Sequence, residues 1–200
     1  RPAIPLSIWL PLAIFILARI YGFAVIAFAS RYQVALPSPD HPGIYQFSAL
    51  PDSPGYLGLI TNWDGQWYER LATVGYHLPA AGDLHGADAL RAFAFPPLFP
   101  MVIGALMTVT VLGFGACVTI VNLVAGGAAM VVMFALVQRT AGRFAAGVAV
   151  LFTNIFVAAP LFQAAYSESI ALLLVCTALL LIARRRYGWA VAAVVLLSLT

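Results

Sequence analysis

The stretch Ile8–Ala29, with the sequence IWLPLAIFILARIYGFAVIAFA, decides the fold class of this chain. A helix needs about 20 mostly apolar residues to cross the hydrocarbon core of a membrane, and this run meets that length. Its single charge is Arg19. The residues before the run do not form a basic segment followed by a small-residue cleavage site, so we expect a membrane anchor rather than a cleaved signal.

The composition of the whole chain agrees with that interpretation. Hydrophobic residues make up 63% of its 200 residues and charged residues 8%, against about 45–50% and about 25% in soluble proteins. A soluble domain of this size leaves too much surface in water to hide so many apolar side chains. Cys117 and Cys176 lie inside apolar runs and indicate neither a disulfide framework nor a metal site. The sequence therefore predicts an all-α fold, a polytopic transmembrane helical bundle.

Apolar runs separated by charged or Gly- and Pro-containing breaks define the expected spans. These are about residues 8–29, 116–138, 144–160, 167–183 and 187–200. A large acidic loop, residues 30–96, follows the first span and is expected to carry short amphipathic helices. A weaker apolar segment, 97–113, comes next. We expect residues 1–200 to form one transmembrane domain and to be the N-terminal part of a longer protein, since the last run stops at Thr200.

Arginines beside the spans predict the orientation, because positive charge is retained on the cytoplasmic side. Arg184–Arg186 and the pair Arg139 and Arg143 are placed inside, which puts the turn before Glu168 outside. If the weaker segment spans, the acidic loop is cytoplasmic; if that segment re-enters or lies in the interface, the loop is external. Its prolines and threonines favour the second alternative. We therefore predict a multi-pass plasma-membrane protein with the acidic loop and Glu168 on the external side.

All three His and six of the seven acids fall in the acidic loop, whose most informative stretch is Asn62–Arg70, NWDGQWYER. On a helix, Trp63 and Trp67 share one face while Asp64 and Tyr68 share the adjoining face. Aromatic rings beside carboxylates are typical of sugar-binding sites. The alternative is a capping box that begins at Thr61, with Asp64 only binding the amides at the start of the helix.

Two charged residues of the apolar body are further candidates. Glu168 is its only acid, and an ionisable group at the membrane edge indicates a functional site. The alternative is a helix start with Ser167 as N-cap and Glu168 in the first turn. Arg19 can hold a lipid phosphate, pair with a carboxylate, or extend its side chain to the headgroups. The histidines lack metal-ligand spacing and are interpreted as surface residues: His41, His77 and His85.

Four separated motifs cover most of the chain in order and spacing. They are Trp63-Asp64 with Trp67-Tyr68, then Gly75-Tyr76, then AFPPLFP over residues 94–100, and finally Pro160 with YSES over residues 166–169. Together they resemble the PIG-V-type mannosyltransferases, polytopic enzymes of the GT-C glycosyltransferase class, and bacterial members above all. That family often has an acid shortly after the Gly-Tyr pair, where this chain has His77.

The resemblance implies an inverting transfer of mannose from a polyprenyl-phosphate-mannose donor to a lipid-linked glycan acceptor at the external membrane face. Asp64 takes the role of general base and Glu168 that of a second acid. The expected partners are the donor, the glycolipid acceptor and the bilayer, with no nucleic acid. The candidate substrate-binding residues are Trp63, Trp67, Tyr68, Glu69, Arg70, Tyr76, Tyr166, Ser167 and Arg19.

The chemistry of the transfer fits these residue types. A sugar hydroxyl loses its proton as it attacks, which calls for one carboxylate base. The leaving phosphate needs positive charge, available from Arg19, Arg70 or Arg91. No cofactor is required, although Asp64 and Glu168 could hold a divalent metal. The alternative function is a non-catalytic membrane subunit or lipid transporter whose external loop binds a partner or lipid headgroup; the repeated halves usual in transporters are not visible in this sequence.

Overall fold

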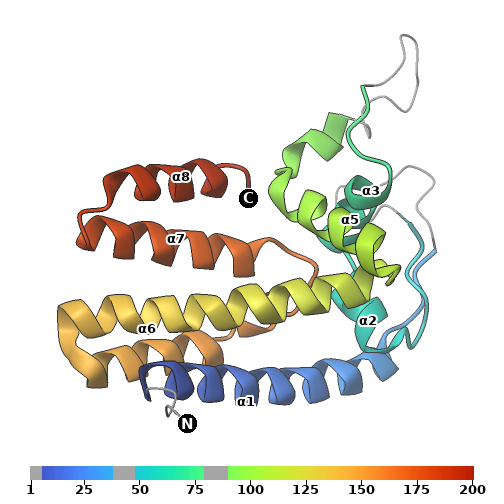
Figure 1. Ribbon diagram of the computed structural model, residues 1–200. Helices are drawn as coiled ribbons and strands as arrows, with labels where there is room; N and C mark the ends of the chain where they lie inside the picture. The colour runs from blue at the N-terminus through green and yellow to red at the C-terminus, as the bar shows by residue number, and fades with distance from the viewer. Residues whose placement is uncertain (1–5, 38–47, 79–89) are drawn as a thin grey trace.

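The computed structural model describes residues 6–37, 48–78 and 90–200, and every regular element in these ranges is helical (Figure 1). The α-helices are α1 (Leu6–Ala29), α2 (Gly55–Ile60), α3 (Asp64–Thr73), α5 (Leu98–Thr110), α6 (Phe114–Ile155), α7 (Glu168–Ala183) and α8 (Tyr187–Leu197). Short 3-10 turns are η1 (Ser30–Tyr32), η2 (Ala92–Ala94) and η3 (Ala159–Phe162). One isolated antiparallel bridge joins Leu36 to Leu50. The all-α prediction is therefore confirmed for the described chain.

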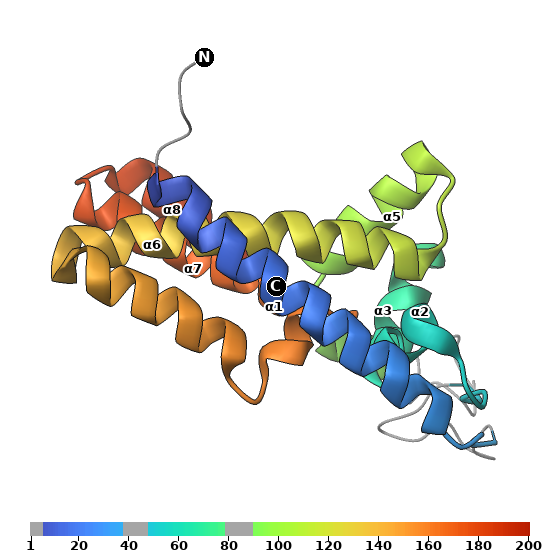
Figure 2. The same cartoon turned by 90° about the horizontal axis from the view of Figure 1, so that it is seen from below.

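Helix α6 reverses direction at Gly142, whose φ of 87° and ψ of 171° are not helical. Glycine adopts this φ without steric cost. The reversal divides α6 into a long arm, residues 114–141, and a short arm, residues 143–155, which lie against each other (Figure 2). Asn154 of the short arm donates a hydrogen bond to the Met130 sulfur of the long arm at 3.0 Å, as antiparallel arms require.

Helices α1, α6, α7 and α8 lie side by side and form the body of the molecule (Figure 1). The contact of α1 with α6 is close because Phe15 packs against two glycines. A Cβ atom at Gly126 would lie 2.9 Å from the Phe15 ring, and one at Gly127 would lie 3.6 Å from it. Small residues of this kind let apolar helices approach each other in a membrane.

Two of the described helices are long and apolar enough to cross a membrane: Leu6–Tyr32, which is α1 with η1, and α6. The apolar helices α5, α7 and α8 are shorter. The weaker segment of the sequence forms α5, which has 13 residues where a span needs about 20. Helix α5 lies with α2 and α3 at one end of the body, inclined to α6 (Figure 1).

The short arm of α6 ends at Ile155, although the sequence predicts a span as far as residue 160. Phe156 is extended, with φ −60° and ψ 150°, and η3 begins at Ala159. Pro160 lacks the amide donor that an α-helix continuing to residue 160 would need, and it is the second residue of η3 instead. An irregular segment therefore connects the short arm to α7.

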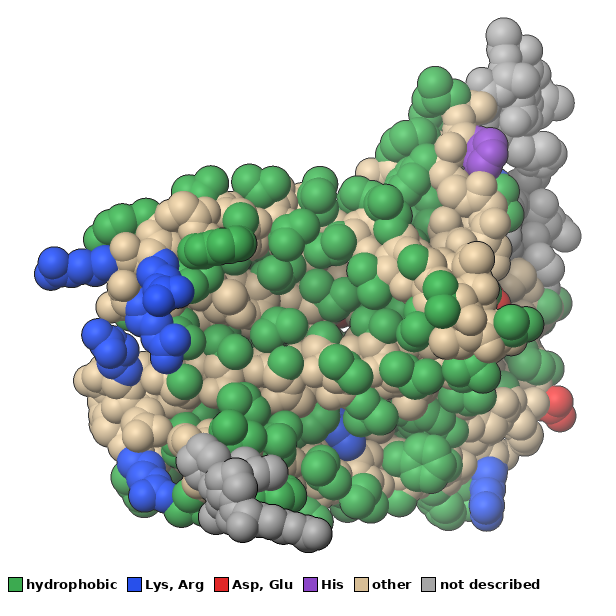
Figure 3. Space-filling view, in the orientation of Figure 1, with side chains coloured by type: hydrophobic (Ala, Val, Ile, Leu, Met, Phe, Trp, Pro, Cys, Tyr) green, Lys and Arg blue, Asp and Glu red, His purple; other side chains and the backbone are tan. Residues whose placement is uncertain are grey.

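Arginine side chains gather at the end of the body opposite α2, α3 and α5 (Figure 3). There α6 reverses and α7 turns into α8, so two groups of arginines that are distant in the sequence come to the same end. All of them are exposed to solvent: Arg139, Arg143, Arg184, Arg185 and Arg186. We call this group the arginine end.

Candidate active site

Helix α3 begins at a sharp corner of the chain. The residue before it, Trp63, has φ 56° and ψ −120°, a sparsely populated conformation for a residue other than glycine. Asn62 holds the corner: its side-chain amide donates to Gln33 Oε1 at 2.6 Å, and its carbonyl accepts from the Gly65 amide at 3.0 Å. These bonds fix the backbone at Asp64, the first residue of α3.

The Asp64 carboxylate does not cap α3. The residue at the N-cap position, Trp63, makes no side-chain cap, and the first free amides of the helix donate to the backbone carbonyls of Asn62 and Trp63, each at 3.0 Å. The Asp64 amide donates to the Tyr166 hydroxyl oxygen. The capping-box alternative is therefore wrong, and the carboxylate remains available for another role.

The start of α3 packs directly against the segment that leads into α7. The Ala165 amide donates to the Ile60 carbonyl at 2.8 Å. A Cβ atom at Gly65 would lie 3.1 Å from the Ala165 methyl carbon, so the two segments can approach this closely only with a small residue there. Asn122 of α6 also holds this segment, because its side-chain amide donates a hydrogen bond to the Ala164 carbonyl at 2.6 Å.

This packing brings Asp64 and Glu168 together, and an electrostatic interaction couples their carboxylates. Two tyrosines lie within reach of both charges. Burial raises the pKa of Tyr68 and of Tyr166, and the negative charges of Asp64 and Glu168 raise both further. Both phenols therefore stay neutral, so each can donate a hydrogen bond beside the acids.

Ser167 links the two helices across the site. Its hydroxyl donates to the oxygen of Tyr68, and its side chain makes no bond to the first turn of α7. The expectation that Ser167 caps α7 with its side chain is therefore wrong. Glu168 is the first residue of α7, where the helix dipole favours a negative charge.

The two carboxylates have similar surroundings: both are half-buried, and burial raises the pKa of each above its ordinary value. Glu168 is half-buried and borders a hollow of about 700 Å³, and its Oε2 is buried without a partner among the described residues. Burial raises the pKa of Asp64 above its ordinary value of 3.8. A higher pKa makes the Asp64 carboxylate a stronger base as long as it is ionised. By this criterion either carboxylate has the surroundings of a proton acceptor.

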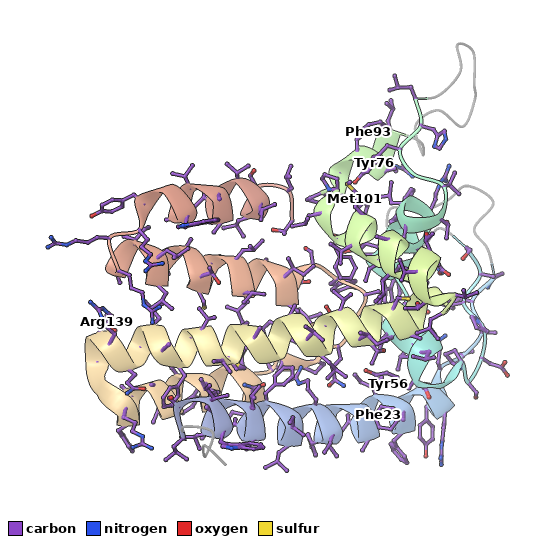
Figure 4. All side chains as sticks on the ribbon, viewed as in Figure 1. Phe23, Tyr56, Tyr76, Phe93, Met101 and Arg139 are labelled. Carbon is purple, nitrogen blue, oxygen red and sulfur yellow. The ribbon has the colours of Figure 1, made fainter. Side chains whose placement is uncertain are left out.

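Two predicted substrate-binding residues belong to the framework instead. Trp67 is 1% exposed and stacks on Phe95 at 5.9 Å between ring centroids. The Tyr76 hydroxyl donates to the Phe95 carbonyl at 2.6 Å, and its ring lies against Phe93 at 5.4 Å (Figure 4). These contacts hold α3 against η2, so the prediction that Trp67 offers its ring to a sugar is wrong.

The remaining predicted residues are dispersed around the acids. Trp63 keeps 47% of its surface exposed next to Asp64, and Arg70 is half-buried on α3. Glu69 lines a different hollow, of about 300 Å³, together with the residues that begin α6. Arg19 is buried between α1 and the short arm. Two of the histidines, His41 and His85, fall outside the described residues, while His77 and Arg91 are exposed.

Sequence reasoning missed the residues that assemble the site. Asn122 was detectable as a buried amide within an apolar run, where a polar group needs a hydrogen-bond partner. The close contact of Gly65 with Ala165 left no signal in a single sequence. Within residues 6–37, 48–78 and 90–200, no group of three or more His, Cys, Asp or Glu could hold a metal ion.

Comparison with models of known protein families, with curated proteins and with solved structures finds no match for this chain. Its function is therefore argued from its own residues.

Proposed function

We propose that this chain belongs to a membrane glycosyltransferase that moves mannose from a polyprenyl-phosphate-mannose donor to a lipid-linked glycan. The observation that carries the proposal is the pairing of Asp64 with Glu168 beside two neutral tyrosines. Sugar hydroxyls are bound by such carboxylates and phenols. The four motifs that resemble the PIG-V type support mannose and the polyprenyl-phosphate donor.

The reaction is a single displacement. Asp64 accepts the proton of the acceptor hydroxyl as that oxygen forms a bond to the anomeric carbon of the donor sugar. The bond from the anomeric carbon to the phosphate oxygen breaks, and its electron pair leaves with the polyprenyl phosphate. Attack opposite the leaving group inverts the anomeric configuration. Glu168 binds a hydroxyl of the donor or acceptor, and the exposed ring of Trp63 covers an apolar sugar face.

The distribution of charge supports a multi-pass arrangement in the plasma membrane. The arginine end (Figure 3) belongs on the cytoplasmic side by the positive-inside rule, which puts the acid pair on the external side. Helix α5 has 13 residues where a span needs about 20, which supports a position in the external interface beside α2 and α3. The donor's lipid tail remains in the bilayer while its sugar reaches the acids.

The test is Asp64→Asn in the full-length protein, with transfer of radiolabelled mannose to membrane glycolipid as the measurement. We expect transfer to fall about 10²- to 10⁴-fold, the usual contribution of a general base. Asp52→Asn is the matched control, because Asp52 is an exposed acid of the same loop. Transfer by Asp64→Asn at the rate of the control would contradict the proposal.

Glu168→Gln separates the enzyme from the alternative, a non-catalytic subunit or lipid transporter. An enzyme loses glycolipid product in both acid variants while the protein stays in the membrane. A non-catalytic subunit keeps normal glycolipids in both acid variants and loses them only when the whole chain is deleted.

A further inference from the structure

Arg19 lies at the middle of α1, at the level where the regular backbone of the short arm stops. Its Nη1 donates to the Ala159 carbonyl at 2.9 Å, and its Nη2 donates to Asn154 Oδ1 at 3.4 Å. Irregular backbone at membrane depth persists only where protein buries it or where it lines a cavity. At Arg19 the irregular backbone is both covered by protein and next to a pocket.

The Arg19 guanidinium is buried without a counter-charge. The side chain is 4% exposed, so the expectation that it extends to the headgroups is wrong. It lies between the rings of Phe15 and Phe162, at 5.3 and 5.8 Å from their centroids. Its hydrogen-bond acceptors are neutral, its Nε has no partner, and no carboxylate of the described chain forms an ion pair with it. A buried cation in this state favours an anion.

A pocket of about 420 Å³ opens beside Arg19 between α1 and the short arm. Gln163 closes one side of it: this residue is 5% exposed, donates from Nε2 to the Arg19 carbonyl at 3.2 Å, and has no partner for its Oε1. The other walls are almost all apolar, and they include Leu17, Val25 and Ile155. The pocket therefore combines one buried cation with walls that suit a hydrocarbon chain.

We propose that this pocket binds a lipid with a phosphate head group, with the phosphate on Arg19 and the hydrocarbon chain between α1 and the short arm. A guanidinium presents fixed N–H donors that match phosphate oxygens, and the buried Nε–H of Arg19 has no hydrogen-bond partner in the described chain. The choice of phosphate over other anions rests on the proposed function, since the donor is a polyprenyl phosphate. Its location is independent of the acid pair.

The phosphate pocket and the acid pair are separated by η3. Phe162, the last residue of η3, contacts the Arg19 guanidinium on one side and borders the hollow of Glu168 on the other. A lipid bound at Arg19 therefore has its head group one short turn of chain away from the site of transfer.

The test measures binding to the purified full-length protein in detergent micelles. The probes are farnesyl phosphate, farnesol and inorganic phosphate. We expect farnesyl phosphate to bind at least about tenfold more tightly than farnesol, and inorganic phosphate to bind far more weakly than either. If farnesol binds as tightly as farnesyl phosphate, the pocket is only an apolar groove. If inorganic phosphate binds tightly, the pocket is a site for free anions. Either result overturns the proposal.

Two pairs of variants locate the binding. Arg19→Gln should abolish the preference for farnesyl phosphate, whereas Arg31→Gln, which removes an exposed arginine beyond the end of α1, should retain it. Ala18→Phe fills the pocket without a change of charge and should weaken farnesyl phosphate binding about tenfold. Ala13→Phe, at an exposed position of α1 outside the pocket, should bind normally.

These outcomes stay decisive if Arg19→Gln does not fold, because wild-type affinity in Ala18→Phe would by itself overturn the proposal. Binding is measured without transfer. If the wild-type protein transfers no sugar but Arg19→Gln loses farnesyl phosphate binding, the pocket is supported and the proposed function is rejected. Sugar transfer by a protein whose Arg19→Gln variant binds farnesyl phosphate normally rejects only the pocket.

Discussion

The two ends of the helical body carry charges of opposite sign, and these charges differ in how far they are buried. At the arginine end, five arginines are exposed, and each can be hydrated by solvent (Figure 3). At the other end, Asp64 and Glu168 are half-buried, coupled to each other and surrounded by phenols. An exposed charge is tolerated almost anywhere, whereas a half-buried one has to be positioned by its neighbours. Under the proposed function, the arginine end supplies the signal for orientation and the acid end the candidate site of transfer.

We expect the largest loss of sugar transfer from a variant that moves Asp64 and Glu168 apart while keeping both acids. Gly65→Leu places a side chain where a Cβ alone would lie 3.1 Å from the Ala165 methyl carbon, so α3 and the segment before α7 have to move apart. We expect sugar transfer to fall about 10²- to 10⁴-fold, as for loss of the base itself. The measurement is transfer rate per amount of protein in the membrane.

Gly188→Leu is the control for that variant. No atom lies within 4 Å of a Cβ at Gly188, which is in α8 near the arginine end. It should transfer normally. Normal transfer in Gly65→Leu as well would show that the acids do not act as a pair.

Removal of charge from the arginine end should change orientation and leave the chemistry intact in correctly inserted molecules. Replacement of Arg184, Arg185 and Arg186 by Gln weakens the positive-inside signal. A cysteine label at Ser53, in a background without Cys117 and Cys176, reports which side the loop faces. We expect labelling from outside intact cells to fall several-fold. Unchanged labelling, or labelling of the parent protein only after lysis, would contradict the assigned orientation.

The pH dependence of transfer sharpens the contrast between a general base and a surface acid. Since burial raises the pKa of Asp64, its base form is lost at a higher pH than for an ordinary aspartate. Below that pKa the rate should fall about tenfold per pH unit. Glu168→Gln should lower the rate and move this limb to lower pH, because the two carboxylates interact and loss of one negative charge favours ionisation of the other. An unshifted limb in Glu168→Gln would show that the two carboxylates do not interact.

The smallest expected effect concerns stability. A raised pKa in the folded state means that the folded protein binds a proton at Asp64 more tightly than the unfolded protein does. The contribution of Asp64 to the free energy of unfolding therefore increases as the pH falls from above its folded-state pKa toward its ordinary pKa. Asp64→Asn should raise the Tm slightly at neutral pH, and this advantage over the wild type should shrink in acid. A lower Tm at neutral pH would show that the carboxylate stabilises the fold.

The sequence predicted the parts of this molecule that depend on local pattern. Apolar runs predicted the all-helical class, and the arginines between runs marked the end where α6 reverses. The isolated position of Glu168 and the aromatic stretch around Asp64 identified the two acids that the fold brings together. Each of these signals is carried by neighbouring residues, so one sequence is enough to detect it.

Contacts between distant segments were not predictable in this way. The Gly65 contact with Ala165 and the bond from Asn122 to Ala164 join residues that have no periodic relation in the sequence. Trp67 matched the sugar-binding pattern because a buried aromatic residue and an exposed one have the same helical spacing in the sequence. Pro160 carried a local signal against an α-helix that continues to residue 160, but the apolar run masked it.

The short arm of α6 has a consequence for how the chain is inserted during synthesis. At 1.5 Å per residue its length, from Arg143 to Ile155, is roughly 20 Å, less than the bilayer core of about 30 Å. Such a segment is too short to cross the bilayer core by itself and needs the long arm as a partner. In a membrane we therefore expect the two arms to enter as one hairpin with Gly142 at its tip. The pocket beside Arg19 lies where the short arm stops.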